Sequence, residues 1–244
     1  MRAAFVILFL FCSISGASAQ SEVLARNFFD QGEFEKALKT YEKLVEENPQ
    51  NTSYFFGLVE SHQQLENFSR AEELLRNKLN NSANNRTLLI ELGHNYELQQ
   101  NTERAEQFYA EALSAVDARP NYAYSIARTF QKYSLLENAA ATYEKAMQLN
   151  NELNFNMQLA RIYGEQGKTE LMFENYLELV DANPDFFPIA NREFGKYISA
   201  DASSEANTIF RRLLLTKLQK DPSLLYNEML SWLFTQEEEF LKAF

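Results

Sequence analysis

The stretch GEFEKALKTYEKLVEENP (residues 32–49) decides the fold, because weaker copies of it follow one another along the chain. The copies are ENFSRAEELLRNKL (66–79), QNTERAEQFYAEAL (100–113), SLLENAAATYEKAM (134–147) and QGKTELMFENYLEL (166–179). A small residue recurs every 34 residues in four of these segments, at Ala37, Ala71, Ala105 and Ala139. A fixed period of this length is typical of proteins built from repeated pairs of helices.

Each copy belongs to a unit of two apolar-periodic runs separated by a polar turn, which predicts an antiparallel helix hairpin. A small residue lets two helices approach closely, and a large ring one turn away fills the space beside it. The rings that we expect to fill this space on the first helices are Phe28, Tyr96, Phe130 and Tyr163, with His62 at the same position. Those on the second helices are Tyr41, Tyr109, Tyr143 and Tyr176.

The period and these residues resemble the tetratricopeptide repeat family, whose units are helix hairpins of about 34 residues. Paired Leu and small residues, such as Leu92-Gly93 and Leu159-Ala160, and the closing Pro49 and Pro184 add to the resemblance. The resemblance implies an all-α fold, a right-handed superhelical solenoid of antiparallel helix hairpins. We expect about six such units plus a truncated seventh.

The predicted organisation begins with five repeats within residues 20–185, at about 18–51, 52–85, 86–119, 120–152 and 153–186. A degenerate repeat follows at 187–223, because Glu193-Phe194 replaces the Leu and small pair there. A truncated repeat at 224–244 has a first helix and only the start of a second, at Ala243. Repeat arrays usually finish with a polar cap, so we expect this sequence to be the N-terminal part of a longer chain.

The opening MRAAFVILFLFCSISGASA (1–19) has an early Arg, an apolar run and small residues before a cleavage position, which predicts a secretory signal peptide cut after Ala19. The apolar run is well short of the about 20 residues that span a bilayer, so no integral membrane span is expected. The interpretation is an exported bacterial protein that is periplasmic or associated with the cell envelope.

The residue content argues against nucleic-acid binding and against most kinds of catalytic or metal site. A net charge of −11 disfavours nucleic-acid binding. The single Cys lies in the leader, only two His are present, and neither a phosphate-binding glycine loop nor a nucleophile elbow occurs. A weak cation site at His94 with Glu91 and Glu97 is an alternative to a solvated acidic face. We therefore predict no enzyme activity, no catalytic residues, no cofactor and no metal.

In the resembling family, stacked first helices form a concave groove that holds a peptide or a partner helix. Mapped onto this sequence, the groove residues are Arg26, His94, Tyr124, Arg128, Gln131, Asn154, Gln158 and Arg161. Arginines in this lane could bind carboxylates with two parallel hydrogen bonds. The alternative is that they offset neighbouring glutamates across adjacent repeats.

The leading interpretation is a non-enzymatic protein–protein interaction scaffold in the cell envelope that binds a protein or peptide partner in this groove. The rival interpretation is the helical arm of a larger enzyme or envelope transport machine whose functional domain lies beyond residue 244. Peripheral association with the envelope is a further expectation, and carbohydrate binding would require exposed aromatic residues in the groove. The basic residues Arg211, Arg212, Lys217 and Lys220 predict either a docking face or a solvated helix face.

Overall fold

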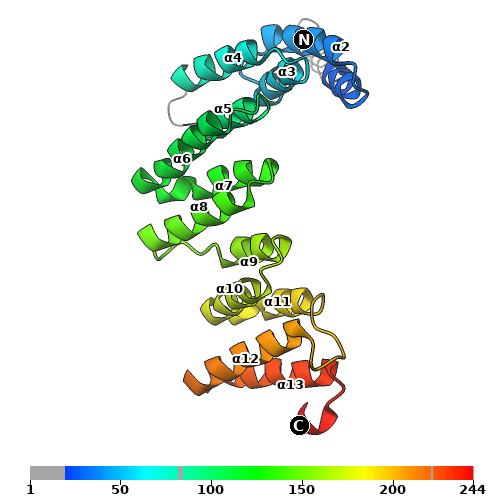
Figure 1. The fold of residues 1–244 in the computed structure, drawn as a ribbon, viewed down its shortest axis with the longest axis vertical. Coiled ribbons are helices and arrows are strands. Elements are labelled where there is room, and N and C mark those ends of the chain that lie inside the picture. The colour runs from blue at the N-terminus through cyan, green and yellow to red at the C-terminus, as the bar shows by residue number, and fades with distance from the viewer. Residues whose placement is uncertain (1–19, 82–84, 221, 244) are drawn as a thin grey trace, which may run out of the picture. The chain divides into compact units, whose positions relative to one another are not determined.

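A computed structural model describes residues 20–81, 85–220 and 222–243, and every regular element within these ranges is helical (Figure 1). The all-α fold of helix hairpins is confirmed. The predicted signal peptide, residues 1–19, lies outside the described residues. The chain divides into two compact units, residues 1–112 and 113–244, with the boundary inside helix α6. The two units are described separately below.

The first unit consists of successive helices joined by short turns. A helix over residues 20–30 is followed by α2 (Phe34–Glu47), α3 (Thr52–Gln64), α4 (Phe68–Asn81), α5 (Thr87–Glu97) and the start of α6 (Thr102–Ala118). The side chain of Asn51 accepts hydrogen bonds from the N–H groups of Ser53 and Tyr54, which fixes the start of α3.

The second unit continues the same alternation of first and second helices. Its elements are η1 (Pro120–Tyr122), α7 (Ala123–Lys132), α8 (Leu136–Leu149), α9 (Asn156–Glu165), α10 (Thr169–Ala182), η2 (Pro184–Phe186), α11 (Phe187–Phe194), α12 (Glu205–Lys220), α13 (Leu224–Gln236) and α14 (Phe240–Ala243). Each 3-10 turn has Pro near its start, and α7 and α11 follow these turns directly.

The turn between the two helices of a hairpin is closed in the same way in every hairpin except the one formed by α11 and α12. One residue adopts a positive φ, at Gly32, Glu66, Gln100, Ser134, Gly167 and Glu238. The next residue donates its N–H to the carbonyl oxygen five positions back, at 2.8–3.0 Å; the acceptors are Phe28, His62, Tyr96, Phe130, Tyr163 and Phe234. This left-handed helix ending satisfies carbonyl groups that the helix itself leaves free.

The small and aromatic repeat positions lie in the interior of each unit. Ala37, Ala71, Ala105 and Ala139 are at most 2% exposed. The second-helix tyrosines and the first-helix rings are also buried, except Phe28, which is half-buried. The close approach is tightest at Gly93, where an added Cβ would lie 2.3 Å from the Tyr109 ring. The tyrosine ring therefore occupies the space that a glycine leaves open.

The sixth hairpin departs from this turn geometry. Its first helix, α11, has only 8 residues, and residues 195–204 connect it to α12 without a positive φ among them. The connection is held by Asn207, whose amide donates to the Ser199 carbonyl at 2.8 Å and whose oxygen accepts from the Ser199 N–H at 3.1 Å.

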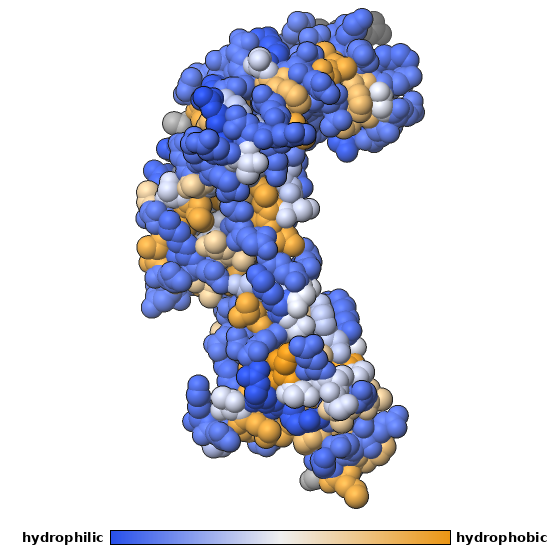
Figure 2. All heavy atoms as spheres, viewed as in Figure 1, coloured by the Kyte–Doolittle hydropathy of each residue, from blue (hydrophilic) through white to orange (hydrophobic). Residues whose placement is uncertain are grey.

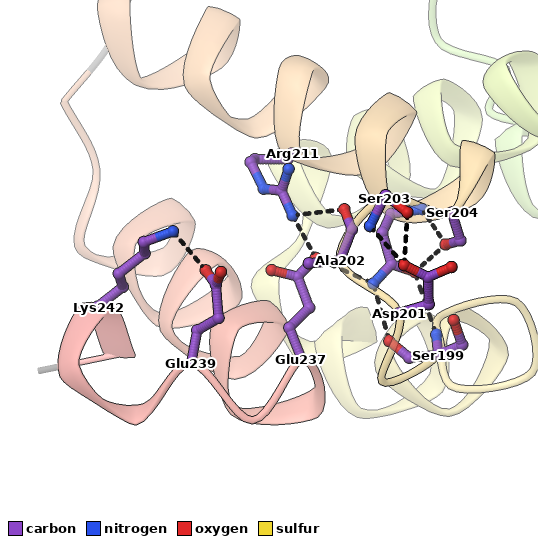
Figure 3. Close-up of polar contacts among 10 residues, drawn as sticks. Ser199, Asp201, Ala202, Ser203, Ser204, Arg211, Glu237, Glu239 and Lys242 are labelled. Carbon is purple, nitrogen blue, oxygen red and sulfur yellow. Dashed lines mark hydrogen bonds and ion pairs between the residues drawn. The ribbon is translucent and has the colours of Figure 1, made fainter.

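A buried carboxylate completes this connection (Figure 3). The Glu237 side chain is 0% exposed, and one of its oxygens accepts from Asn207 at 2.9 Å and from Arg211 at 2.5 Å. Arg211 also donates to the Ala202 carbonyl at 3.1 Å. A buried charge persists only when it is paired and hydrogen-bonded, and here the pairing joins the end of α13 to α12 and the preceding loop.

Hydrophobic residues gather at the C-terminal end of the second unit, over α13 and α14 (Figure 2). Leu224 is 75% exposed, Phe240 is 56% exposed and Leu241 is 99% exposed. Large apolar side chains are therefore exposed on α13 and α14.

Candidate functional site

The two candidate groove residues in the first unit are engaged with neighbours on their own helices. Arg26 Nε lies 3.1 Å from the Asp30 carboxylate, one helical turn away. His94 lies on α5 with its Nδ1 3.5 Å from the Glu97 carboxylate. Arg26 therefore pairs with an aspartate of its own helix, whereas the alternative expectation was that the arginines offset glutamates across adjacent repeats.

In the second unit, α7 and α9 bring five of the candidate residues to one pocket of about 460 Å³. The contributors from the sequence prediction are Tyr124, Arg128, Gln131, Gln158 and Arg161. Lys132, Tyr143 and Glu165 complete the lining. Asn154 is not part of it; its side-chain oxygen accepts from the Asn156 N–H at 3.0 Å at the start of α9.

A second pocket, of about 410 Å³, lies beside the first and is formed by α9, α10, α11 and the residues that follow α11. Its lining is Ala160, Arg161, Gly164, Glu165, Met172, Tyr176, Glu193, Lys196 and Tyr197. Since Arg161 and Glu165 line both pockets, the two form one groove along the first helices of the second unit, which we call the α7–α9–α11 groove.

The absence of a side chain at Gly164 keeps the second pocket open. A Cβ built there would lie 2.9 Å from the Tyr197 hydroxyl and 3.2 Å from the Met172 sulfur. Tyr197 is 37% exposed and borders this space.

The arginines of the α7–α9–α11 groove differ from Arg26 in their partners. Among the described residues, neither Arg128 nor Arg161 lies within ion-pair distance of a carboxylate. Arg128 is exposed, lies over the Tyr124 ring at 5.9 Å from its centroid and donates to the Tyr124 hydroxyl at 3.4 Å. Two guanidinium groups thus remain available to an incoming anion.

The two acidic residues of the groove, Glu165 and Glu193, differ in whether they form ion pairs. Glu193 is paired with Lys196 and lies 3.5 Å from Arg192, and the hydrogen bond from Lys196 lowers the pKa of the Glu193 carboxyl. Glu165 forms no ion pair within the described parts of the chain. The first pocket therefore holds two arginines and one lysine against a single carboxylate.

Tyr143 is one of the residues that line the first pocket, and its hydroxyl has no hydrogen-bond partner among the described residues. The side chain is 0% exposed, and burial raises the pKa of Tyr143 to about 12, so the hydroxyl is a donor at neutral pH. The equivalent residue one repeat earlier, Tyr109, donates to the Glu97 carboxylate at 2.8 Å. A buried hydroxyl without a partner is uncommon and marks a place where an acceptor can bind.

Sequence models described as tetratricopeptide repeat match residues 24–51 and 153–186. Two segments of the chain are thus similar to tetratricopeptide repeats. The second match covers α9 and α10, which form the centre of the α7–α9–α11 groove.

Solved structures of tetratricopeptide repeat proteins are similar to the chain at low identity. TTC0263 of Thermus thermophilus is 19% identical, with 72% of this chain and 96% of that chain covered and a TM-score of 0.38. PilF of Pseudomonas aeruginosa is 19% identical, with 88% and 97% covered and a TM-score of 0.37. YrrB, described as having an unusual peptide-binding site, is 16% identical, with 71% and 89% covered and a TM-score of 0.34. A comparison with curated proteins found no match.

The tetratricopeptide repeats matched at these two segments support a protein–protein interaction scaffold, and the fold is generally a non-catalytic one. Within the described ranges, no cluster of three or more His, Cys, Asp and Glu side chains could hold a metal ion. No helix in the same ranges has the length and apolar character needed to cross a bilayer.

Three of the four basic residues of α12, Arg211, Arg212 and Lys217, form ion pairs with acidic residues. Arg211 binds Glu237, Arg212 lies 2.8 Å from Glu170, and Lys217 lies 2.6 Å from both Glu178 and Asp181. The expectation of a solvated helix face was also incomplete, because these contacts join α12 to neighbouring helices.

Sequence reasoning missed Lys132 and the part of the second pocket that α10, α11 and the residues after α11 contribute, and it treated Tyr143 only as a packing residue. The spacing held a signal for Lys132, which follows Arg128 by one helical turn on the same face of α7. The second pocket had no comparable signal, because Glu193, Lys196 and Tyr197 lie in the hairpin where the repeat pattern weakens.

Proposed function

We propose that the chain is a non-enzymatic scaffold that holds an extended segment of a partner protein in the α7–α9–α11 groove. The observation that carries this proposal is the pair of adjoining pockets that share Arg161 and Glu165. Rigid helices on both sides hold the lining in place, so a bound segment loses conformational freedom while the groove loses little.

The lining suits a peptide better than a small apolar ligand. Amide and guanidinium groups of Gln131, Gln158 and Arg161 can bond to a backbone that runs along the groove. Exposed and partly buried rings, such as Tyr124 and Tyr197, offer contact area at a low cost in side-chain entropy.

Site-specific photo-crosslinking in the native cell tests this proposal. A photoreactive residue at Gln131 is expected to capture a protein partner, because Gln131 lines the first pocket. The matched control is Gln148, an exposed residue of the second helix α8 that lines neither pocket. Capture from both positions alike, or from neither, would reject the groove as the binding surface.

We further propose that the scaffold works in the cell envelope after export. Support comes from the sequence of residues 1–19, with its apolar run and small residues before Gln20. Any peripheral attachment to the envelope would then be made through the bound partner. Cell fractionation combined with the intact mass of the native protein tests this, and a cytoplasmic protein that retains residues 1–19 would refute it.

A further inference from the structure

The α7–α9–α11 groove also indicates what kind of segment it binds, and this inference rests on the proposed function. We propose that the partner segment is acidic, with an Asp or Glu carboxylate bound in the first pocket by Arg128, Arg161 and Tyr143. A neighbouring small or apolar side chain of the same segment occupies the second pocket.

The charge of the first pocket runs against that of the whole chain. The protein has a net charge of −11, with 34 acidic and 23 basic residues. In the first pocket, however, the charged residues are Arg128, Lys132 and Arg161 against Glu165 alone. A local excess of positive charge in an acidic protein attracts anions and disfavours basic segments.

The donors that face the first pocket match a carboxylate. Arg128 and Arg161 are free of ion pairs among the described residues, and a guanidinium binds a carboxylate through two parallel hydrogen bonds. The Tyr143 hydroxyl is buried and lacks an acceptor. A carboxylate has about four lone-pair positions, enough to accept from both arginines and the hydroxyl together.

The second pocket differs from the first in its net charge, so the two pockets select different side chains of the bound segment. Its charged residues are balanced, because Arg161 and Lys196 face Glu165 and Glu193. Ala160, Gly164 and Met172 provide a small apolar surface between them. A side chain without charge fits there, since a second carboxylate would meet two acids.

A fluorescence anisotropy titration with short labelled peptides tests the inference on the full chain. The probe is a peptide of alternating Asp or Glu and Leu or Ala residues, with blocked ends so that only side-chain carboxylates carry charge. Its control is the same peptide with Asn and Gln in place of the acids. We expect the acidic peptide to bind at least about tenfold more tightly than the amide peptide.

Matched variants locate the effect. Arg161→Gln is expected to weaken acidic-peptide binding about tenfold, because it removes a charge-assisted hydrogen-bond donor. Arg212→Gln removes the same charge from α12, outside both pockets, and is expected to leave binding within about twofold. Tyr143→Phe keeps the ring and removes only the hydroxyl, so about a threefold to tenfold loss is expected.

The outcomes separate this inference from the proposed function. Equal binding of the acidic and amide peptides, or equal effects of Arg161→Gln and Arg212→Gln, would overturn the acidic preference. If neither peptide binds while Gln131 still captures a partner in cells, the acidic preference fails and the groove proposal stands. If Gln131 captures nothing and neither peptide binds, both fail.

Discussion

Tyr109 and Tyr143 occupy the same position in consecutive repeats, 34 residues apart, and differ in what their hydroxyl groups bind. Both rings are at most 1% exposed. The Tyr109 hydroxyl donates to the Glu97 carboxylate at 2.8 Å, whereas the Tyr143 hydroxyl has no partner among the described residues. Replacing each tyrosine with phenylalanine therefore removes a hydrogen-bonded hydroxyl at position 109 and a hydroxyl without a partner at position 143.

The expected changes in the free energy of unfolding have opposite signs. Tyr109→Phe loses a hydrogen bond to a carboxylate that is 47% exposed on its side chain, so it should destabilise by about 1 kcal/mol. Glu97 can then be solvated, which keeps the loss near the lower end of the range. Tyr143→Phe removes a buried polar group that no bond compensates, so it should stabilise by about 1 kcal/mol.

Urea denaturation followed by circular dichroism measures both changes. In a chain of this size, about 1 kcal/mol corresponds to a shift of about 2–4 °C in Tm, which gives an independent check. If Tyr143→Phe destabilises as much as Tyr109→Phe, then the Tyr143 hydroxyl has an acceptor in solution. That result would refute the argument that this hydroxyl is free to bind a ligand.

Three further substitutions test the packing, the buried network and the protonation of the array. Gly93→Ala should destabilise the fold by about 1–3 kcal/mol, because the added Cβ would lie 2.3 Å from the Tyr109 ring. Gly195→Ala is the control: its Cβ would lie 3.6 Å from the nearest atom, so the same urea titration should show a change close to zero. Glu237→Ala should destabilise the fold by about 3 kcal/mol, because it leaves Arg211 and Asn207 without their acceptor. Lys242→Ala breaks an exposed ion pair with Glu239 and should cost less than about 0.5 kcal/mol. Equal costs for the two variants would contradict the role of burial. Burial lowers the pKa of His62 below its ordinary value of 6.5, so near this pH the unfolded chain binds more protons than the folded chain, and the free energy of unfolding should fall as the pH drops below about 6.5. His62→Phe should reduce the slope of the free energy of unfolding against pH between about pH 7 and pH 5. An unchanged slope would exclude His62 as its source.

The repeat fold was predictable because a fixed period reports directly on helix packing. The small residues at Ala37, Ala71, Ala105 and Ala139 lie in the core, and the structure adds a left-handed turn residue at the same distance before each. The sixth hairpin was less predictable. Its stability depends on Asn207 and Glu237, which are 30 positions apart, and a buried carboxylate has no signature in a hydrophobic pattern.

The candidate site was predictable in its location and less so in its contacts. Arg26 and Arg161 each have an acid four residues later, Asp30 and Glu165, which is favourable spacing for a helical ion pair. Only the first pair forms in the structure. The choice of side-chain rotamer decides this, and it depends on neighbours from other helices, such as Tyr176, which interacts with Arg161.

The sharing of Arg161 and Glu165 between two pockets has a consequence for any ligand that fills both. The two side chains of such a ligand act on the same guanidinium and the same carboxylate, so their contributions to affinity should be cooperative or anticooperative. A double-mutant cycle on the ligand, with one position changed in each pocket, would give a coupling free energy different from zero. The side chain preferred in one pocket would then depend on the side chain bound in the other, and the groove would recognise pairs of residues.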